Sequence, residues 1–182
     1  MLTHRFIVII SYSTGENLRN TQAAPSSRLD SENFRNTNNK GTEMQTYKEL
    51  LKEAQKLNDK GFCGVIAFAT LANISFKRAA TKLEKAGARK HRTGTLDDGV
   101  VKVLENQGLT VDRIPVTPNT MTAHQATKRY SRGRYFVVFH GTINHHAALV
   151  NGKFNDWIDR EHRGKAPRYK ISKIYRVIEN NA

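Results

Sequence analysis

The hydrophobic positions of the chain follow a helical period up to Gly108 and a strand period beyond it. Apolar residues spaced three and four positions apart predict helices over residues 47–57 and 75–86, and again over residues 95–107. Residues 61–72 instead form a nearly unbroken run of apolar and small side chains. A helix that is apolar on every side has to be buried on every side, so this run predicts a central core helix.

The second half of the chain alternates apolar and polar residues over short segments, as strands do. The predicted strands cover residues 109–114, 134–140, 145–150, 153–157 and 169–178, and a short helix is predicted over residues 121–128. Asn151-Gly152 is the clearest hairpin turn in the chain. Helices first and strands second predict an α+β fold, in which an antiparallel sheet packs on the central helix that carries Cys63.

Residues 1–43 differ in composition from the remainder of the chain. After a short apolar run at residues 6–10 they are rich in Ser, Thr and Asn, which is typical of a disordered extension. The apolar run is too short for the core of a secretory signal. A second hypothesis is that translation starts at Met44, because Lys40-Gly41 can be encoded by a purine-rich stretch like a bacterial ribosome-binding site. Under either hypothesis the folded domain comprises residues 44–182.

Composition adds a strong positive charge and a single thiol. The formal net charge is +14, and nearly all of the basic excess falls within residues 44–182. Such a charge favours nucleic acid or another acidic partner, but it does not indicate a reaction. One cysteine excludes an internal disulfide and a multi-thiolate metal site, and it fits a reducing, cytoplasmic compartment. No apolar run is long enough to span a membrane.

The spacing of Cys63, His145 and Asp156 predicts a catalytic site. Cys63 opens the core helix, where unpaired backbone N–H groups favour a thiolate. His145 begins one strand of the predicted hairpin and Asp156 ends the other, so we expect them to be cross-strand partners with Cβ atoms ~5 Å apart. Asp156 would then bind one nitrogen of His145 while the other nitrogen faces Cys63. The alternative for Cys63 alone is a small buried hydrophobic residue.

Three segments resemble the papain-like cysteine peptidases, in particular the compact ones of bacteriophages and bacteria. They are Gly-Phe-Cys-Gly-Val-Ile-Ala-Phe-Ala-Thr at residues 61–70, Gly-Arg-Tyr-Phe-Val-Val at 133–138 and His-His-Ala-Ala-Leu-Val-Asn-Gly-Lys-Phe-Asn-Asp-Trp at 145–157. The resemblance implies a papain-like fold and hydrolysis of peptide or related amide bonds in a protein or peptide substrate, without a cofactor. Cys63 would be the nucleophile, His145 the general base and Asp156 the orienting carboxylate. The protein would act in the cytoplasm, that of the host if a phage encodes it.

The resemblance also bears on the neighbours of these residues. The oxyanion of the tetrahedral intermediate would be held by the backbone N–H of Cys63 and by an upstream side-chain amide, that of Asn58 or Gln55. The family's pattern places the histidine seven positions before the turn glycine, which selects His145. On an alternating strand His146 points to the opposite face. We therefore expect an ordinary strand-edge role for His146, with most activity retained in His146→Ala.

Two other kinds of function stay open. A nucleic-acid-binding or host-protein-binding module on the same fold, without catalysis, would use the basic clusters. Its candidate phosphate contacts are Arg89, Lys90, Arg92, Arg132, Arg163 and Arg168. A metal site drawn from His140, His145, His146 and Asp156 lacks a recognised ligand spacing, so no metal is predicted.

Overall fold

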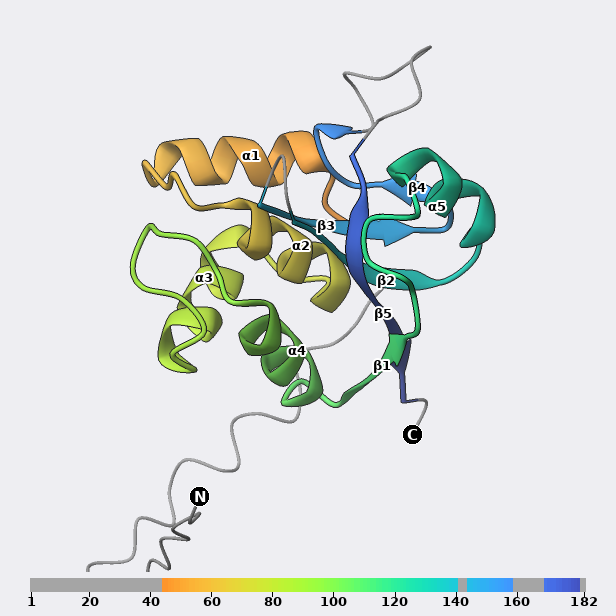
Figure 1. The fold of residues 1–182 in the computed structure, drawn as a ribbon. Helices are drawn as coiled ribbons and strands as arrows, with labels where there is room; N and C mark the ends of the chain where they lie inside the picture. Colours follow the sequence, from red (N-terminus) through yellow and green to blue (C-terminus); the bar gives the residue numbers. More distant parts are fainter. Residues whose placement is uncertain (1–43, 141–143, 159–168, 181–182) are drawn as a thin grey trace, which may run out of the picture. The chain divides into compact units, whose positions relative to one another are not determined.

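A computed structural model describes residues 44–140, 144–158 and 169–180. The described residues form five helices and one five-stranded sheet (Figure 1). The elements are α1 (Tyr47–Lys56), α2 (Cys63–Ala72), α3 (Phe76–Lys85), α4 (Asp97–Glu105), β1 (Leu109–Ile114), α5 (Ala123–Arg129), β2 (Arg134–Phe139), β3 (His145–Val150), β4 (Lys153–Phe154) and β5 (Ile171–Glu179). The predicted α+β class is confirmed. The predictions for residues 1–43 and for Arg163 and Arg168 fall outside the described residues.

The sheet has the strand order β1-β5-β2-β3-β4, and every neighbouring pair is antiparallel. The predicted hairpin turn is confirmed: Val150 pairs with Lys153, and Asn151 and Gly152 between them have φ values of 47° and 77°. Strand β4 is shorter than predicted and pairs only with the end of β3. The first residues of β3 therefore lie beyond the reach of β4 in the ladder, and the candidate site is built there.

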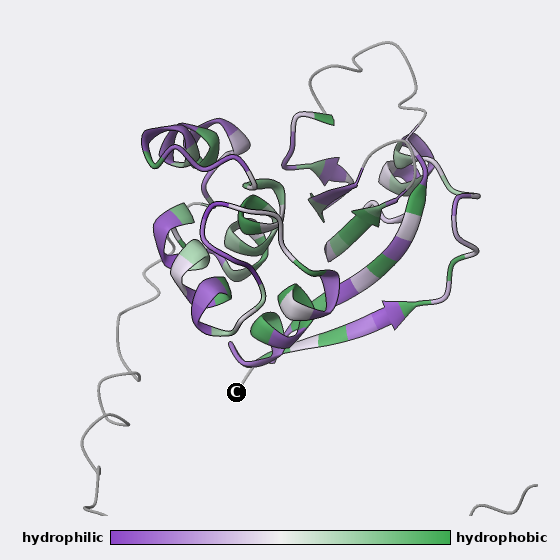
Figure 2. Ribbon diagram, turned by 60° about the vertical axis from the view of Figure 1, so that its left-hand side comes forward, coloured by the Kyte–Doolittle hydropathy of each residue, from purple (hydrophilic) through white to green (hydrophobic). Residues whose placement is uncertain are grey.

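The sheet separates two apolar cores. On one face Phe136, Val138 and Ala148 pack with residues of α1 to α4, and on the other face Val137 and Leu149 pack with residues of α5. Figure 1 shows α2 against the sheet with α1, α3 and α4 around it, and Figure 2 shows hydrophobic colour over most of α2. Residues 64–71 of α2 are all buried, so the predicted core helix is confirmed.

Hydroxyl side chains cap the first turns of two helices on the α2 side of the sheet. Thr46 and Ser75 cap α1 and α3 by accepting hydrogen bonds from backbone N–H groups of the first turn. The helix predicted over residues 95–107 begins two residues later, because the N-cap of α4 is Leu96, which makes no side-chain capping bond. The Thr95 side chain packs against the start of α2 instead, because Gly64 leaves room for it there. Among the described residues, no helix combines the length and apolar character that crossing a bilayer requires.

Candidate active site

Cys63 is the first residue of α2 and is half-buried. Its neighbours Gly61 and Gly64 let the segment at residues 93–95 pack directly onto this end of the helix. A Cβ atom at Gly61 would lie 2.1 Å from the backbone carbon of Thr93, and one at Gly64 would lie 2.6 Å from Cβ of Thr95. The N–H groups in the first turn of a helix have no intrahelical acceptor, so the thiol stands beside free donors.

A buried ion pair fixes the turn that leads into Cys63. Oδ1 of Asp59 accepts a hydrogen bond from the backbone N–H of Gly61 at 3.0 Å, and Oδ2 accepts one from Nη2 of Arg89 at 2.9 Å. Arg89 is 5% exposed. The prediction that Arg89 contacts phosphate is therefore wrong, because its guanidinium neutralises a buried carboxylate inside the protein. Lys90, Arg92 and Arg132 are exposed, as that prediction requires of them.

His145 and Asp156 are hydrogen-bonded, as the sequence predicted. Nε2 of His145 lies 2.9 Å from Oδ2 of Asp156, and Oδ1 of Asp156 accepts a hydrogen bond from the backbone N–H of Ile158 at 3.1 Å. Asp156 is only 3% exposed, so the carboxylate is held on both oxygens in a dry environment. The ring of Trp157 packs against that of His145 with centroids 5.4 Å apart and helps to fix the imidazole.

The two residues are nonetheless not direct cross-strand partners. Leu149 pairs with Phe154 and the backbone N–H of Asn155 bonds to the carbonyl of Ala148, so the same register places Asp156 beside Ala147. His145 and Asp156 are therefore diagonal neighbours on one face, a separation that long side chains can bridge. The expected direct pairing is therefore wrong. The two-residue turn pairs Val150 with Lys153, and the register that follows places Ala147, not His145, opposite Asp156.

The Cys63 thiol interacts with two imidazoles. Burial would raise the pKa of the thiol, but hydrogen bonding and charge from His145 and then His146 lower that pKa to about 5. Burial likewise lowers the pKa of His145, while Asp156 and then Cys63 override it and raise that pKa to about 9. Between these values the favoured state is a thiolate beside an imidazolium, which is the reactive form of a catalytic cysteine.

His146 lies on the sheet face opposite to His145, as alternation predicted, but its expected strand-edge role is wrong. It is 7% exposed, and its Nε2 lies 2.7 Å from Oδ1 of Asp97. Burial lowers the pKa of His146, but hydrogen bonds to Asp97 and then to Cys63 override it and raise that pKa. The face that His146 points to is the one on which α2 packs, and its Nδ1 lies beside Gly64, so the side chain interacts with the thiol of the preceding residue.

The two side-chain amides predicted to hold the oxyanion lie on the surface of the protein. Asn58 and Gln55 are both exposed, and none of the described contacts joins either side chain to Cys63.

Two residues of the site, Asp59 and Asp97, were not predicted from the sequence. The only signal for Asp59 was its place four residues before the cysteine, and Asp97 was predicted only as part of the helix over residues 95–107.

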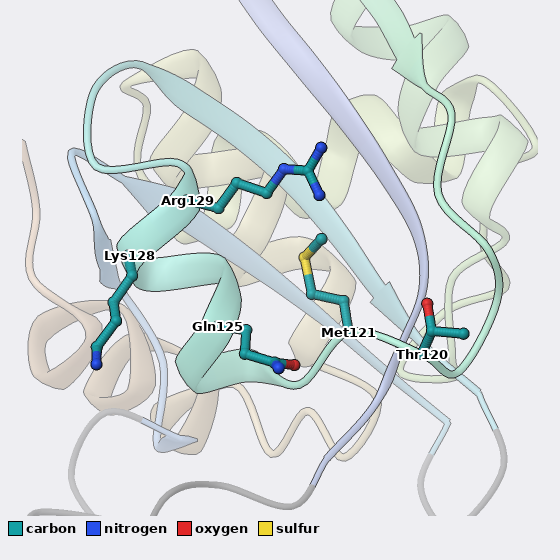
Figure 3. Close-up of a pocket in the computed structure, with 5 residues that line it drawn as sticks. All are labelled: Thr120, Met121, Gln125, Lys128 and Arg129. Carbon is teal, nitrogen blue, oxygen red and sulfur yellow. The ribbon is translucent and has the colours of Figure 1, made fainter.

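A pocket of about 510 Å³ lies elsewhere, beside α5 (Figure 3). It is lined by Thr120, Met121, Gln125, Lys128 and Arg129, and includes none of the three predicted catalytic residues. Within the described part of the chain, no group of three or more His, Cys, Asp or Glu residues is placed to hold a metal ion.

The fold and site together define an α+β protein with a half-buried thiol at a helix start and an imidazole–carboxylate pair from a hairpin beside it. Comparisons with protein-family models, curated proteins and solved structures found no match.

Proposed function

We propose that this protein is a cysteine-dependent hydrolase of peptide or related amide bonds, with a papain-like arrangement of Cys63, His145 and Asp156. The observation that supports it best is the convergence of these residues, from α2 and from either side of the hairpin turn, into one hydrogen-bonded set. A thiol with a lowered pKa, next to an imidazole that a buried carboxylate orients, is the arrangement that nucleophilic catalysis requires. The antiparallel sheet packed on the helix that bears the thiol agrees with the papain-like interpretation.

Each residue then has one role in the reaction. The Cys63 thiolate attacks the carbonyl carbon of the substrate, and the resulting oxyanion is stabilised by the unpaired N–H groups at the start of α2. His145 donates its proton to the leaving amine as the C–N bond breaks, which leaves a thioester on Cys63. Neutral His145 then removes a proton from water, the hydroxide attacks the thioester, and the acid is released with the thiolate restored. Asp156 keeps the His145 ring oriented throughout.

The test of this proposal is cleavage of a peptide library by the full chain, with new termini identified by mass spectrometry. Wild-type protein is expected to produce cleavages that Cys63→Ala and His145→Ala do not. His124→Ala is the matched control, because His124 is an exposed histidine on α5. Cleavage that persists in Cys63→Ala would overturn the proposal.

The second candidate is a binding module without catalysis. The observation in its favour is the charge of +14 together with the exposure of Lys90, Arg92 and Arg132. Binding of this kind releases counterions, so its affinity falls steeply with salt. Binding to nucleic acid that is lost at high salt, with no cleavage activity dependent on Cys63, would favour this candidate.

A further inference from the structure

A second imidazole–carboxylate pair lies next to the thiol, on the other face of the sheet from the His145–Asp156 pair. Nε2 of His146 lies 2.7 Å from Oδ1 of Asp97, and Oδ2 of Asp97 accepts a hydrogen bond from Nζ of Lys173 at 3.0 Å. Nε2 of the exposed His140 lies 3.5 Å from the same oxygen. Asp97 thus holds His146 in one orientation, with its Nε2 occupied.

The sheet places these groups in a row. Val138 on β2 is paired with His146 on β3 and with Lys173 on β5, so the two basic side chains flank it across three neighbouring strands. Asp97 is in the first turn of α4, where the helix dipole favours a negative charge. Hydrogen bonding from His146, and then from Lys173, keeps the pKa of Asp97 well below its usual range. The carboxylate therefore stays ionised and favours the protonated form of His146.

The free nitrogen of this imidazole lies beside the start of α2. A Cβ atom at Gly64 would lie 3.0 Å from Nδ1 of His146, and Gly64 directly follows the cysteine. Nδ1 is buried and has no hydrogen bond of standard geometry with the described residues. Because a buried nitrogen without a partner is costly, its occurrence here calls for an explanation. The Cys63 thiol supplies one, since the thiol and His146 interact.

We propose that His146, held by Asp97, is a second imidazole on the Cys63 thiolate and positions and stabilises it, so that two imidazole–carboxylate pairs serve one nucleophile. His146 has no accessible surface at Nδ1 for a substrate atom to reach. It therefore acts through Cys63, whereas His145 exchanges protons with the substrate. The inference rests on the proposed function in taking the Cys63 thiolate as the nucleophile. The stabilisation of the thiolate can nevertheless be measured without any substrate.

The charged groups around the thiol are consistent with separate roles for His145 and His146. Cys63, Asp97 and Asp156 are the acidic groups, and His145, His146 and Lys173 are the basic ones, with the exposed His140 at the edge of Asp97. Removing the imidazole of His146 leaves the half-buried thiolate with His145 as its one imidazole partner instead of two. A buried charge that loses a partner shifts its pKa toward the neutral form, here the thiol.

The experiment is the rate of Cys63 alkylation by iodoacetamide against pH, read by the intact mass of the full chain. His146→Gln and Asp97→Asn are compared with wild type and His145→Gln, and His124→Gln is the control. The wild-type midpoint is expected near 5. In His146→Gln and Asp97→Asn the midpoint should rise by at least about one pH unit toward the unperturbed thiol value of 9.0. A merely structural role would lower the melting temperature of these variants without moving the midpoint.

The outcomes separate this inference from the proposed function. An unchanged midpoint in folded His146→Gln, together with a raised one in His145→Gln, overturns the role of His146 and leaves the triad intact. A raised midpoint in His146→Gln with none in His145→Gln supports His146 and overturns the triad as proposed. An ordinary midpoint in wild type overturns both. If His146→Gln does not fold, Asp97→Asn decides, because it removes the charge and keeps the size of the side chain.

Discussion

Nε2 of His145 and Oδ2 of Asp156 lie 2.9 Å apart although the two residues are diagonal rather than direct partners in the hairpin. The other nitrogen of His145 is left for the Cys63 thiol, and Asp156 is fixed by its second bond to the backbone N–H of Ile158. Because both oxygens of Asp156 are hydrogen-bonded, the carboxylate is fixed and holds the imidazole in one orientation.

Loss of this carboxylate should lower activity without unfolding the protein. Asp156→Asn keeps the size of the side chain but removes the charge that raises the pKa of His145. We expect turnover to fall by about 10²-fold or more, because general base catalysis contributes ~10²–10⁴. Steady-state rates on a peptide found by the library screen measure the change, and circular dichroism checks the fold. Turnover equal to that of wild type would contradict the triad.

The pH dependence of turnover should be bell-shaped. The thiol with a pKa of about 5 must lose its proton, and the imidazole with a pKa of about 9 must keep its proton. The value of kcat/KM should therefore rise through about pH 5, stay level near neutrality and fall through about pH 9. Because Cys63 and His145 interact, the two midpoints belong to the coupled pair. A profile that rises only above pH 8 would show that the thiol is not activated.

The same pair should make stability depend on pH. The folded-state pKa of His145 is raised from 6.5 to about 9, so its stabilising contribution is complete below 6.5 and is lost as the pH rises through 9. The folded-state pKa of Cys63 is lowered from 9.0 to about 5, so its contribution is complete above 9.0 and is lost as the pH falls through 5. Melting temperatures of wild type and Cys63→Ala, measured from pH 4 to pH 10, should differ in pH dependence over this window. Parallel curves would argue against an ion pair.

A methyl group at Gly64 should disturb the site more than one at Gly94. The added Cβ would lie 2.7 Å from Oγ1 of Thr95 and 3.0 Å from Nδ1 of His146. Overpacking of this kind costs about 1–3 kcal/mol, so Gly64→Ala should unfold at lower denaturant concentration and react more slowly at Cys63. Gly94→Ala is the control, because a Cβ there meets no atom within 4 Å. Equal stability of the two variants would contradict the close packing of residues 93–95 on α2.

Removal of Arg89 should cost stability rather than nucleic-acid affinity. Arg89→Ala leaves the buried Asp59 carboxylate without its cation, and breaking a buried ion pair costs about 3–5 kcal/mol. Lys90→Ala, at the exposed neighbouring position, should change the free energy of unfolding by less than about 0.5 kcal/mol. Urea denaturation measures both. An Arg89→Ala protein of wild-type stability that binds nucleic acid weakly would restore the surface role first predicted for this residue.

The sequence alone was enough to predict most of the elements and one pair of the site. Residues 64–71 are apolar all round, so α2 had to be buried wherever the other elements packed. The Asn151-Gly152 turn set the hairpin, and a hairpin is local, so His145 and Asp156 were brought together by residues close in the chain.

The tertiary structure alone decided what surrounds the thiol. Asp97 and His146 are 49 positions apart, Lys173 and Asp97 are 76 apart, and Arg89 and Asp59 are 30 apart. No local periodicity connects such residues. In the sequence, Asp97 lies in a segment typical of a helix and Arg89 lies in a basic cluster. Each finds its buried partner, His146 for Asp97 and Asp59 for Arg89, only when α4 and the segment before it pack against α2 and the sheet. The physical reason is that a buried charge is costly in free energy unless it is paired. Which charged residues become buried depends on the whole fold.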